Sequence, residues 1–112
     1  MDRVTFEQLV ARALDGVPEP FASALGDVAV VVEDRSPPDE PDLYGLYLGA
    51  PLDEPWAADG ALPPMIAVYM YPLIDDCATE QELIDEVRIT VLHELGHHLG
   101  MDEDQLDALG YG

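Results

Sequence analysis

Residues 93–104 read HELGHHLGMDED, and within this segment two histidines, His93 and His97, stand four positions apart. In an α-helix, residues four apart lie on one face and one turn from each other, so both imidazoles can reach a single ion. Glu94 follows the first histidine and projects beside the pair, where it can hold a water molecule. Two neutral imidazoles that bind Zn²⁺ beside a glutamate acting as general base form the H-E-x-x-H arrangement of zinc hydrolases. The segment therefore predicts a site for one zinc ion.

The histidines close a helix that is predicted to begin at Thr79, because Thr79 and Glu82 are spaced as a capping box. One side of this helix is apolar and is expected to pack against a sheet. Its members are Ile84, Val87, Val91 and Leu95, flanked by Leu92 and Leu99. The opposite side is expected to line a cleft and carries Glu86, Thr90, His93 and His97. Gly100 then lets the chain turn back.

A mononuclear catalytic zinc needs three protein ligands and one open position for water. The third ligand is expected after the turn at Gly100, where three carboxylates follow in a row: Asp102, Glu103 and Asp104. The three-residue step from Gly100 selects Glu103. A loop can absorb a shift of one residue, so Asp104 is the main alternative and Asp102 the other.

Two further residues that can bind metals have simpler interpretations. His98 lies on the apolar side of the helix, so we expect a core histidine, or one that orients a ligand, rather than a ligand. Cys77 is the single cysteine of the chain, which permits no internal disulfide and fits a reducing compartment. We expect it to be a small buried apolar residue rather than an additional ligand.

The composition limits the classes of protein and partner. A length of 112 residues predicts one domain, residues 1–112, with a single modest core. Four basic residues, all arginine, against 24 acidic ones give a net charge of −20, which argues against nucleic acid and anionic membranes as partners. Genome composition or a solubility surface explains this bias most simply, and a preference for cationic substrates is the alternative. The chain has no long apolar stretch and no basic region leading into one, which predicts a soluble cytoplasmic protein.

The residues before the motif helix predict a helix, a short helical turn and three strands. The first helix runs from Thr5, as its cap, to about Leu14, and the helical turn lies within residues 20–26. The strands are expected at residues 27–34, 43–48 and 65–71. The β-branched run of the first strand predicts burial on both faces, and Pro72 is expected to stop the third. Proline-rich loops are expected at residues 36–42 and 51–64, the second with Trp56 as its only large anchor.

The segment 79–112 resembles the small single-domain bacterial zincin-like metallopeptidases, whose pattern is H-E-x-x-H-x-x-G-x-x-D. His93, Glu94, His97 and Gly100 match this pattern position for position. At the position where the family usually has aspartate, this sequence has Glu103, directly followed by Asp104. The match at this position is therefore one of carboxylate chemistry and not of residue type. Residues 105–106 and 109–112 are also similar to the family.

The resemblance implies a zincin-like α+β fold, in which a small mixed sheet of three or four strands packs on the N-terminal helix and the H-E-x-x-H helix. Larger relatives place a methionine turn beneath the zinc after the third ligand. No methionine follows Met101 here, so Tyr111 is the residue that can fill this place, by packing under the site or by bonding a ligand. The alternative interpretation is a tyrosine that docks the C-terminal segment.

The implied activity is zinc-assisted hydrolysis of a peptide bond in a peptide or protein substrate. Glu94 would take a proton from water and pass it to the leaving amine. Tyr111 or a loop histidine is the candidate partner of the oxyanion, and the peptide is expected to lie along a sheet edge as an added strand. The alternative is a metal- or peptide-binding module of weak or no catalytic power. A purely structural zinc domain is disfavoured, because it would have four ligands and would leave Glu94 without a role.

Overall fold

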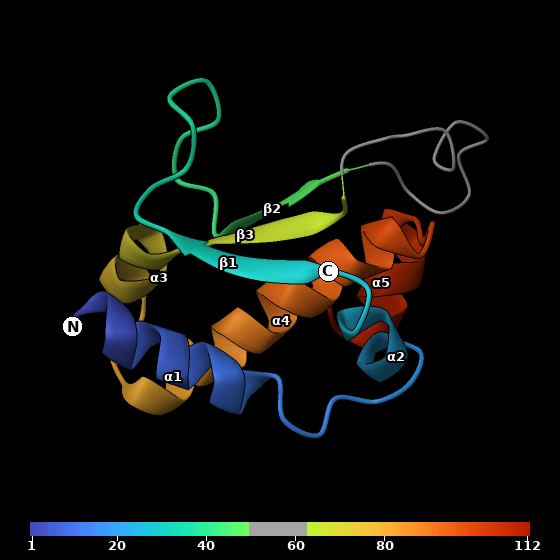
Figure 1. Cartoon of the computed structure of the whole chain (residues 1–112), viewed down its shortest axis with the longest axis horizontal. Helices are drawn as coiled ribbons and strands as arrows, with labels where there is room; N and C mark the ends of the chain where they lie inside the picture. Colours follow the sequence, from blue (N-terminus) through green and yellow to red (C-terminus); the bar gives the residue numbers. More distant parts are fainter. Residues whose placement is uncertain (50–62) are drawn as a thin grey trace.

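The computed structural model describes residues 1–49 and 63–112. Along these residues the elements are α1 (Arg3–Ala13), α2 (Phe21–Leu25), β1 (Ala29–Glu33), β2 (Gly45–Leu48), β3 (Met65–Tyr69), α3 (Met70–Asp76), α4 (Glu80–His98) and α5 (Glu103–Leu109) (Figure 1). Trp56 and most of the second predicted loop lie outside the described residues.

The three strands form one mixed sheet in the order β1-β3-β2. The central strand β3 pairs in parallel with β1, with Ala29 opposite Met65, and antiparallel with β2, with Gly45 opposite Val68. Helices α1 and α4 lie together on one face of this sheet, and α4 contacts both β2 and β3 (Figure 1). The predicted α+β architecture, a small mixed sheet packed on the first helix and the motif helix, is confirmed.

The core lies between the sheet and the helices and holds α4 in place. Val87, Val91 and Leu95 of α4 are fully buried. They belong to one apolar cluster with side chains of α1 and β3, among them Phe6, Leu9, Ile66 and Val68. Each such side chain contributes about 1.5–3 kcal/mol of burial free energy, so the helix that carries both histidines is a rigid support.

Both ends of α4 are closed by specific hydrogen bonds. At the first end, the Thr79 hydroxyl accepts from the Glu82 N–H at 3.1 Å, as predicted, while the Glu82 carboxylate accepts from the N–H of Ala78 at 3.0 Å rather than from that of Thr79. At the second end, Gly100 has a φ of 80°. Its N–H donates to the His97 carbonyl and the Met101 N–H donates to the Gly96 carbonyl, the pairing by which a left-handed glycine ends a helix. The predicted turn at Gly100 is confirmed.

The first strand and the first helix differ from their predictions. Only Val32 of β1 is buried, and Ala29 and Glu33 are exposed, so burial on both faces was wrong. The reason is position, because β1 lies at the edge of the sheet and not at its centre. Helix α1 begins at Arg3 rather than Thr5, since Asp2 is the cap and its carboxylate accepts from the Thr5 N–H at 2.8 Å.

Two short helices were not predicted. The third strand ends at Tyr69, and the chain passes directly into α3, which contains Pro72. Proline fits there because it occupies the first turn, where a backbone N–H has no partner within the helix. The segment expected to be a loop after Gly100 forms α5, whose cap is Asp102.

Candidate metal centre

The two motif histidines lie side by side on α4, with their ring centroids 4.7 Å apart. Nδ1 of His93 lies 2.7 Å from the main-chain carbonyl oxygen of Tyr111. A carbonyl oxygen can only accept, so Nδ1 carries the proton of the neutral ring and Nε2 presents its lone pair. This is the arrangement by which a carbonyl fixes the tautomer and orientation of a metal-binding histidine.

Glu103, the first residue of α5, faces both histidines. Its Oε1 lies 2.9 Å from Nε2 of His97 and 3.5 Å from Nε2 of His93. The hydrogen bond from His97 is the main cause that lowers the pKa of the Glu103 carboxyl group. Ligand atoms about 2.0–2.1 Å from a tetrahedral zinc are roughly 3.3 Å from one another. The separations from Glu103 to both histidines lie around this value, so Glu103 is placed to share an ion with either histidine.

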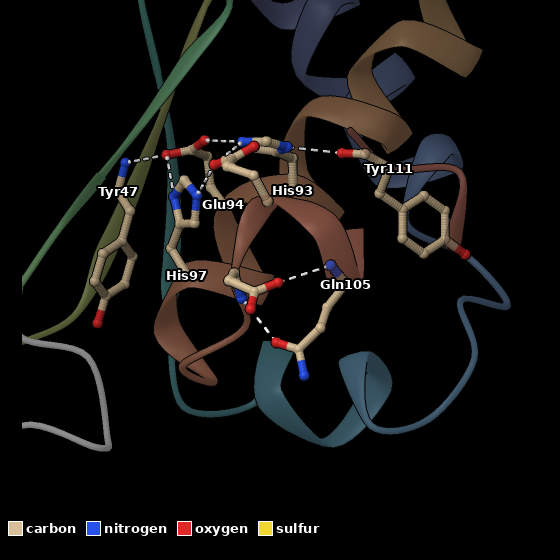
Figure 2. Close-up of polar contacts among 8 residues, drawn as sticks. Tyr47, His93, Glu94, His97, Gln105 and Tyr111 are labelled. Atoms are coloured by element: carbon tan, nitrogen blue, oxygen red, sulfur yellow. Dashed lines mark hydrogen bonds and ion pairs between the residues drawn. The ribbon is translucent and has the colours of Figure 1, made fainter. Parts of the chain in front are cut away.

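Glu94 lies against the same cluster and is buried, with 8% of its surface exposed. Its Oε1 accepts from the main-chain N–H of Tyr47 in β2 at 2.7 Å, and its Oε2 lies 3.8 Å from Nε2 of His93 (Figure 2). His93, Glu94 and His97 each offer a ligand atom within 4.8 Å of the others, so these three form a candidate metal site. One oxygen of Glu94 is held by β2, whereas Oε1 of Glu103 lies nearer to both Nε2 atoms.

The other two predicted alternatives for the third ligand lie elsewhere on α5. Asp102 caps the helix, since its carboxylate accepts from the Gln105 N–H and Gln105 accepts in return from the Asp102 N–H, both at 2.8 Å (Figure 2). Asp104 is exposed in the first turn. Of the three carboxylates, it is Glu103 that the structure brings to the histidines.

Gly96 explains how α5 comes close enough to α4. A Cβ atom at Gly96 would lie 2.3 Å from Cδ2 of Leu106, which is fully buried. The missing side chain therefore makes room for Leu106, and the contact places the start of α5 over the histidines. Gly96 thus has a packing role, in which the close approach is made by a side chain and not by a backbone.

Tyr111 meets the site through its main chain. Its carbonyl holds His93, while its ring packs edge-on against Phe21 of α2 with centroids 5.4 Å apart. Figure 2 shows the ring directed away from Glu94 and His97. The Tyr111 ring thus docks the C-terminal segment, and it is the Tyr111 carbonyl that bonds His93, a proposed metal ligand. A catalytic role for the phenol stays a prediction, and no contact of the ring with the cluster supports it.

A family model described as zincin-like metallopeptidase matches residues 25–112. The chain belongs to this family. Among solved structures, a conserved hypothetical protein from Thermus thermophilus is similar, with 28% identity and a TM-score of 0.58. The match covers 96% of this chain and 99% of that one. No curated protein matches.

Helix α4, which carries the family's H-E-x-x-H motif, borders a cavity of about 290 Å³. Its walls include Glu86, Thr90 and His93 but not His97, so three of the four residues predicted on the cleft side line it. Tyr44 and Gly45 form part of the opposite wall. The Tyr44 hydroxyl bonds the Asp76 carboxylate, which raises the pKa of Tyr44 to about 12, so the phenol stays protonated.

His98 and Cys77, the two residues expected not to be ligands, differ in how far they are buried. His98 is 2% exposed, and its Nδ1 lies 2.8 Å from the Tyr47 hydroxyl, so the core position is confirmed. Burial lowers the pKa of His98 and raises that of Tyr47, which favours a hydroxyl that donates to a neutral ring. Cys77 is only half-buried, at the edge of the core.

Sequence reasoning missed the main-chain partners of the site. The N–H of Tyr47 and the carbonyl of Tyr111 belong to the backbone, so no residue type marks them. Gly45 did carry a signal, because a glycine inside a strand often marks a close approach of another group.

Among the described residues, no helix is long and apolar enough to cross a membrane.

Proposed function

We propose that the protein is a zinc-dependent peptide hydrolase in which Glu94 is the general base. His93, His97 and Glu103 would hold the ion. The observation that carries this proposal is the convergence of both Nε2 atoms on Oε1 of Glu103, at 2.9 and 3.5 Å, with the Glu94 carboxylate beside them. Family membership supports the same interpretation.

Each residue then has one task. Bound zinc would lower the pKa of a water molecule towards neutrality and polarise the scissile carbonyl. Glu94 would accept a proton from the attacking water and donate it to the leaving amine. The Tyr111 carbonyl keeps His93 in the tautomer that leaves Nε2 unprotonated. The Tyr47 N–H holds one oxygen of Glu94, so that the other is directed at the cluster.

Strand β2 is the proposed platform for the peptide. The Tyr69 N–H donates to the carbonyl of Tyr44, the residue before β2, so Tyr44 and Leu46 direct their main-chain groups to β3. The main-chain groups of Gly45 and Tyr47 therefore point to the other side, next to the cavity and Glu94. An extended peptide that pairs with the main-chain groups of Gly45 and with the Tyr47 carbonyl would lie beside the proposed base, while the Tyr47 N–H stays bonded to Glu94.

The charge of the cavity favours peptides with cationic side chains. Glu86 lines the cavity and also a second hollow whose walls include Asp76, Glu82 and Asp85. The four arginines of the chain make their contacts elsewhere, with Asp34, Glu80, the Asp15 carbonyl and the Tyr71 ring. A lysine or arginine of the substrate would therefore meet carboxylates that no arginine neutralises.

The test combines metal content with hydrolysis. Protein purified without chelator should contain zinc, and it should cleave an unbiased peptide mixture in a reaction that chelator stops and zinc restores. Cleavage should be enriched next to arginine and lysine. Zinc at stoichiometric level without cleavage of any peptide would favour the alternative, a metal- or peptide-binding module.

A further inference from the structure

Strand β2 lies unusually close to α4 at Gly45. A Cβ atom at this position would lie 2.6 Å from Cγ2 of Thr90, 3.1 Å from the Ala67 carbonyl oxygen and 3.9 Å from Cγ of Glu94. The first separation is one that real Cβ atoms essentially never show. Gly45 is not among the residues with positive φ, so the glycine is required here by space and not by backbone conformation.

Two residues further along, the same strand holds the proposed base. Along a strand, side chains and main-chain groups point in the same direction at every second residue. Gly45 and Tyr47 therefore present the same side of β2 to α4. The Tyr47 N–H donates to Oε1 of Glu94 at 2.7 Å (Figure 2). Hydrogen bonds to a charged carboxylate are short and strong, but they weaken quickly as the groups separate. The distance between β2 and α4 therefore sets the orientation of the Glu94 carboxylate.

We propose that Gly45 is a positioning residue for Glu94. By leaving room for the Thr90 methyl group, Gly45 lets β2 approach α4 until the Tyr47 N–H reaches the carboxylate. A side chain at position 45 would move β2 away from α4 and lengthen this hydrogen bond. The proposal rests on the proposed function only for its catalytic consequence, because the contact itself can be measured without substrate or metal.

The first experiment follows the hydrogen exchange of the Tyr47 amide by NMR in the metal-free protein. Gly45→Ala should speed this exchange at least about tenfold, the lower range for a bond to a charged group, and Glu94→Ala should do the same by removing the acceptor. Gly45→Ala with Thr90→Ser, which removes the crowded methyl group, should return the rate to within about threefold of Thr90→Ser alone. The amide of Leu48, which pairs with Met65 on the other side of β2 and lies beyond the crowded Ala67 carbonyl, is the control and should not change.

These outcomes separate positioning from a general effect on the sheet. Equal acceleration at Leu48 and Tyr47 would mean that the strand frays, and it would overturn the proposal, as would a double variant that exchanges as fast as Gly45→Ala. If Gly45→Ala does not fold, the double variant decides. Slow exchange of Tyr47 in the double variant supports the proposal, and fast exchange overturns it.

The second experiment measures catalysis. Gly45→Ala should keep its zinc but lose about ten- to a hundredfold in kcat, the scale of a catalytic group displaced by about 1 Å, and Thr90→Ser should restore most of the loss in the double variant. An unchanged kcat despite faster Tyr47 exchange would overturn the positioning role. A parent protein without any hydrolysis would overturn the proposed function instead, and the exchange rates would still decide whether Gly45 orients Glu94.

Discussion

The carbonyl oxygen of Tyr111 lies 2.7 Å from Nδ1 of His93 and so ties the C-terminal segment to the proposed metal site. Two features hold the carbonyl there. Gly110 turns the chain after α5 with a φ of 89°, and the Tyr111 ring packs on Phe21. Because the bond uses the backbone, the side chain of Tyr111 matters through its ring and not through its hydroxyl.

Tyr111→Phe should therefore keep the zinc affinity of the parent within about twofold, since the ring contact remains. Tyr111→Ala should weaken zinc binding by roughly tenfold or more, the usual cost of losing a group that orients a ligand. Competition with a zinc-sensitive dye measures both. Unchanged zinc affinity but a large loss of kcat in Tyr111→Phe would instead assign the phenol to catalysis.

The third ligand can be identified by comparing neighbours on α5. Glu103→Ala should lower zinc affinity by at least about tenfold, because it removes the carboxylate that faces both Nε2 atoms. Asp104→Ala is the matched control, as it removes an exposed charge from the same turn and should change the affinity by less than about threefold. Equal losses in the two variants would point to net charge rather than coordination.

Replacing Glu94 should show whether this residue acts as the general base or as a metal ligand. Glu94→Gln keeps the size of the side chain and an oxygen that can accept from Tyr47, so zinc content should be unchanged. Hydrolysis should fall at least on the order of 10²-fold, the usual contribution of a positioned general base. Activity within a few-fold of the parent would remove Glu94 from the mechanism, and loss of zinc would make it a ligand.

Gly96→Ala should disturb the metal site without touching a ligand. The added methyl group would collide with Leu106 and push α5, with Glu103, away from the histidines. We expect weaker zinc binding by about tenfold, and partial recovery in Gly96→Ala with Leu106→Ala, which relieves the collision but leaves a smaller core. If Leu106→Ala alone binds zinc as weakly as Gly96→Ala, loss of packing rather than collision is the cause.

The stability of the metal-free protein should fall as the pH is lowered from 7.5 to 5. Burial lowers the pKa of His98, and the opposing charge of Asp27 is the smaller effect. The folded state therefore keeps His98 neutral at pH values where the unfolded chain, with a pKa of about 6.5, takes up a proton. Protons bound only by the unfolded state favour unfolding. Urea unfolding should show a shallower decline for His98→Gln, and parallel declines would contradict this origin.

Features that depend on local helical geometry could be predicted from the sequence. The pairing of His93 with His97, the cap at Thr79 and the turn at Gly100 follow from spacings of a few residues. The three-residue step to Glu103 selected the carboxylate that faces the histidines, although the helix α5 that carries it was not expected.

Features that depend on tertiary position could not be predicted in the same way. The β-branched run at residues 28–32 does not reveal that β1 lies at an edge, and the apolar run that includes Tyr69 continues unbroken from β3 into α3. Asp2 and Thr5 are both residue types that cap helices well, so the residue types alone do not say which of them begins the helix. The cap is the residue whose side chain reaches a free N–H of the first turn, and here that is Asp2. Backbone partners such as the Tyr47 N–H leave no trace in the residue type.

The groups around the candidate site differ in how far apart they lie along the chain. His97 and Glu103 are separated by six residues and His93 and Tyr111 by 18, whereas the bond from Tyr47 to Glu94 spans 47. Contacts between nearby residues form faster than those that close a long loop. The half of the site that carries the proposed ligands can therefore assemble early in folding, before β2 has docked. A fluctuation that releases β2 alone would leave these ligands together but free Glu94 from its anchor.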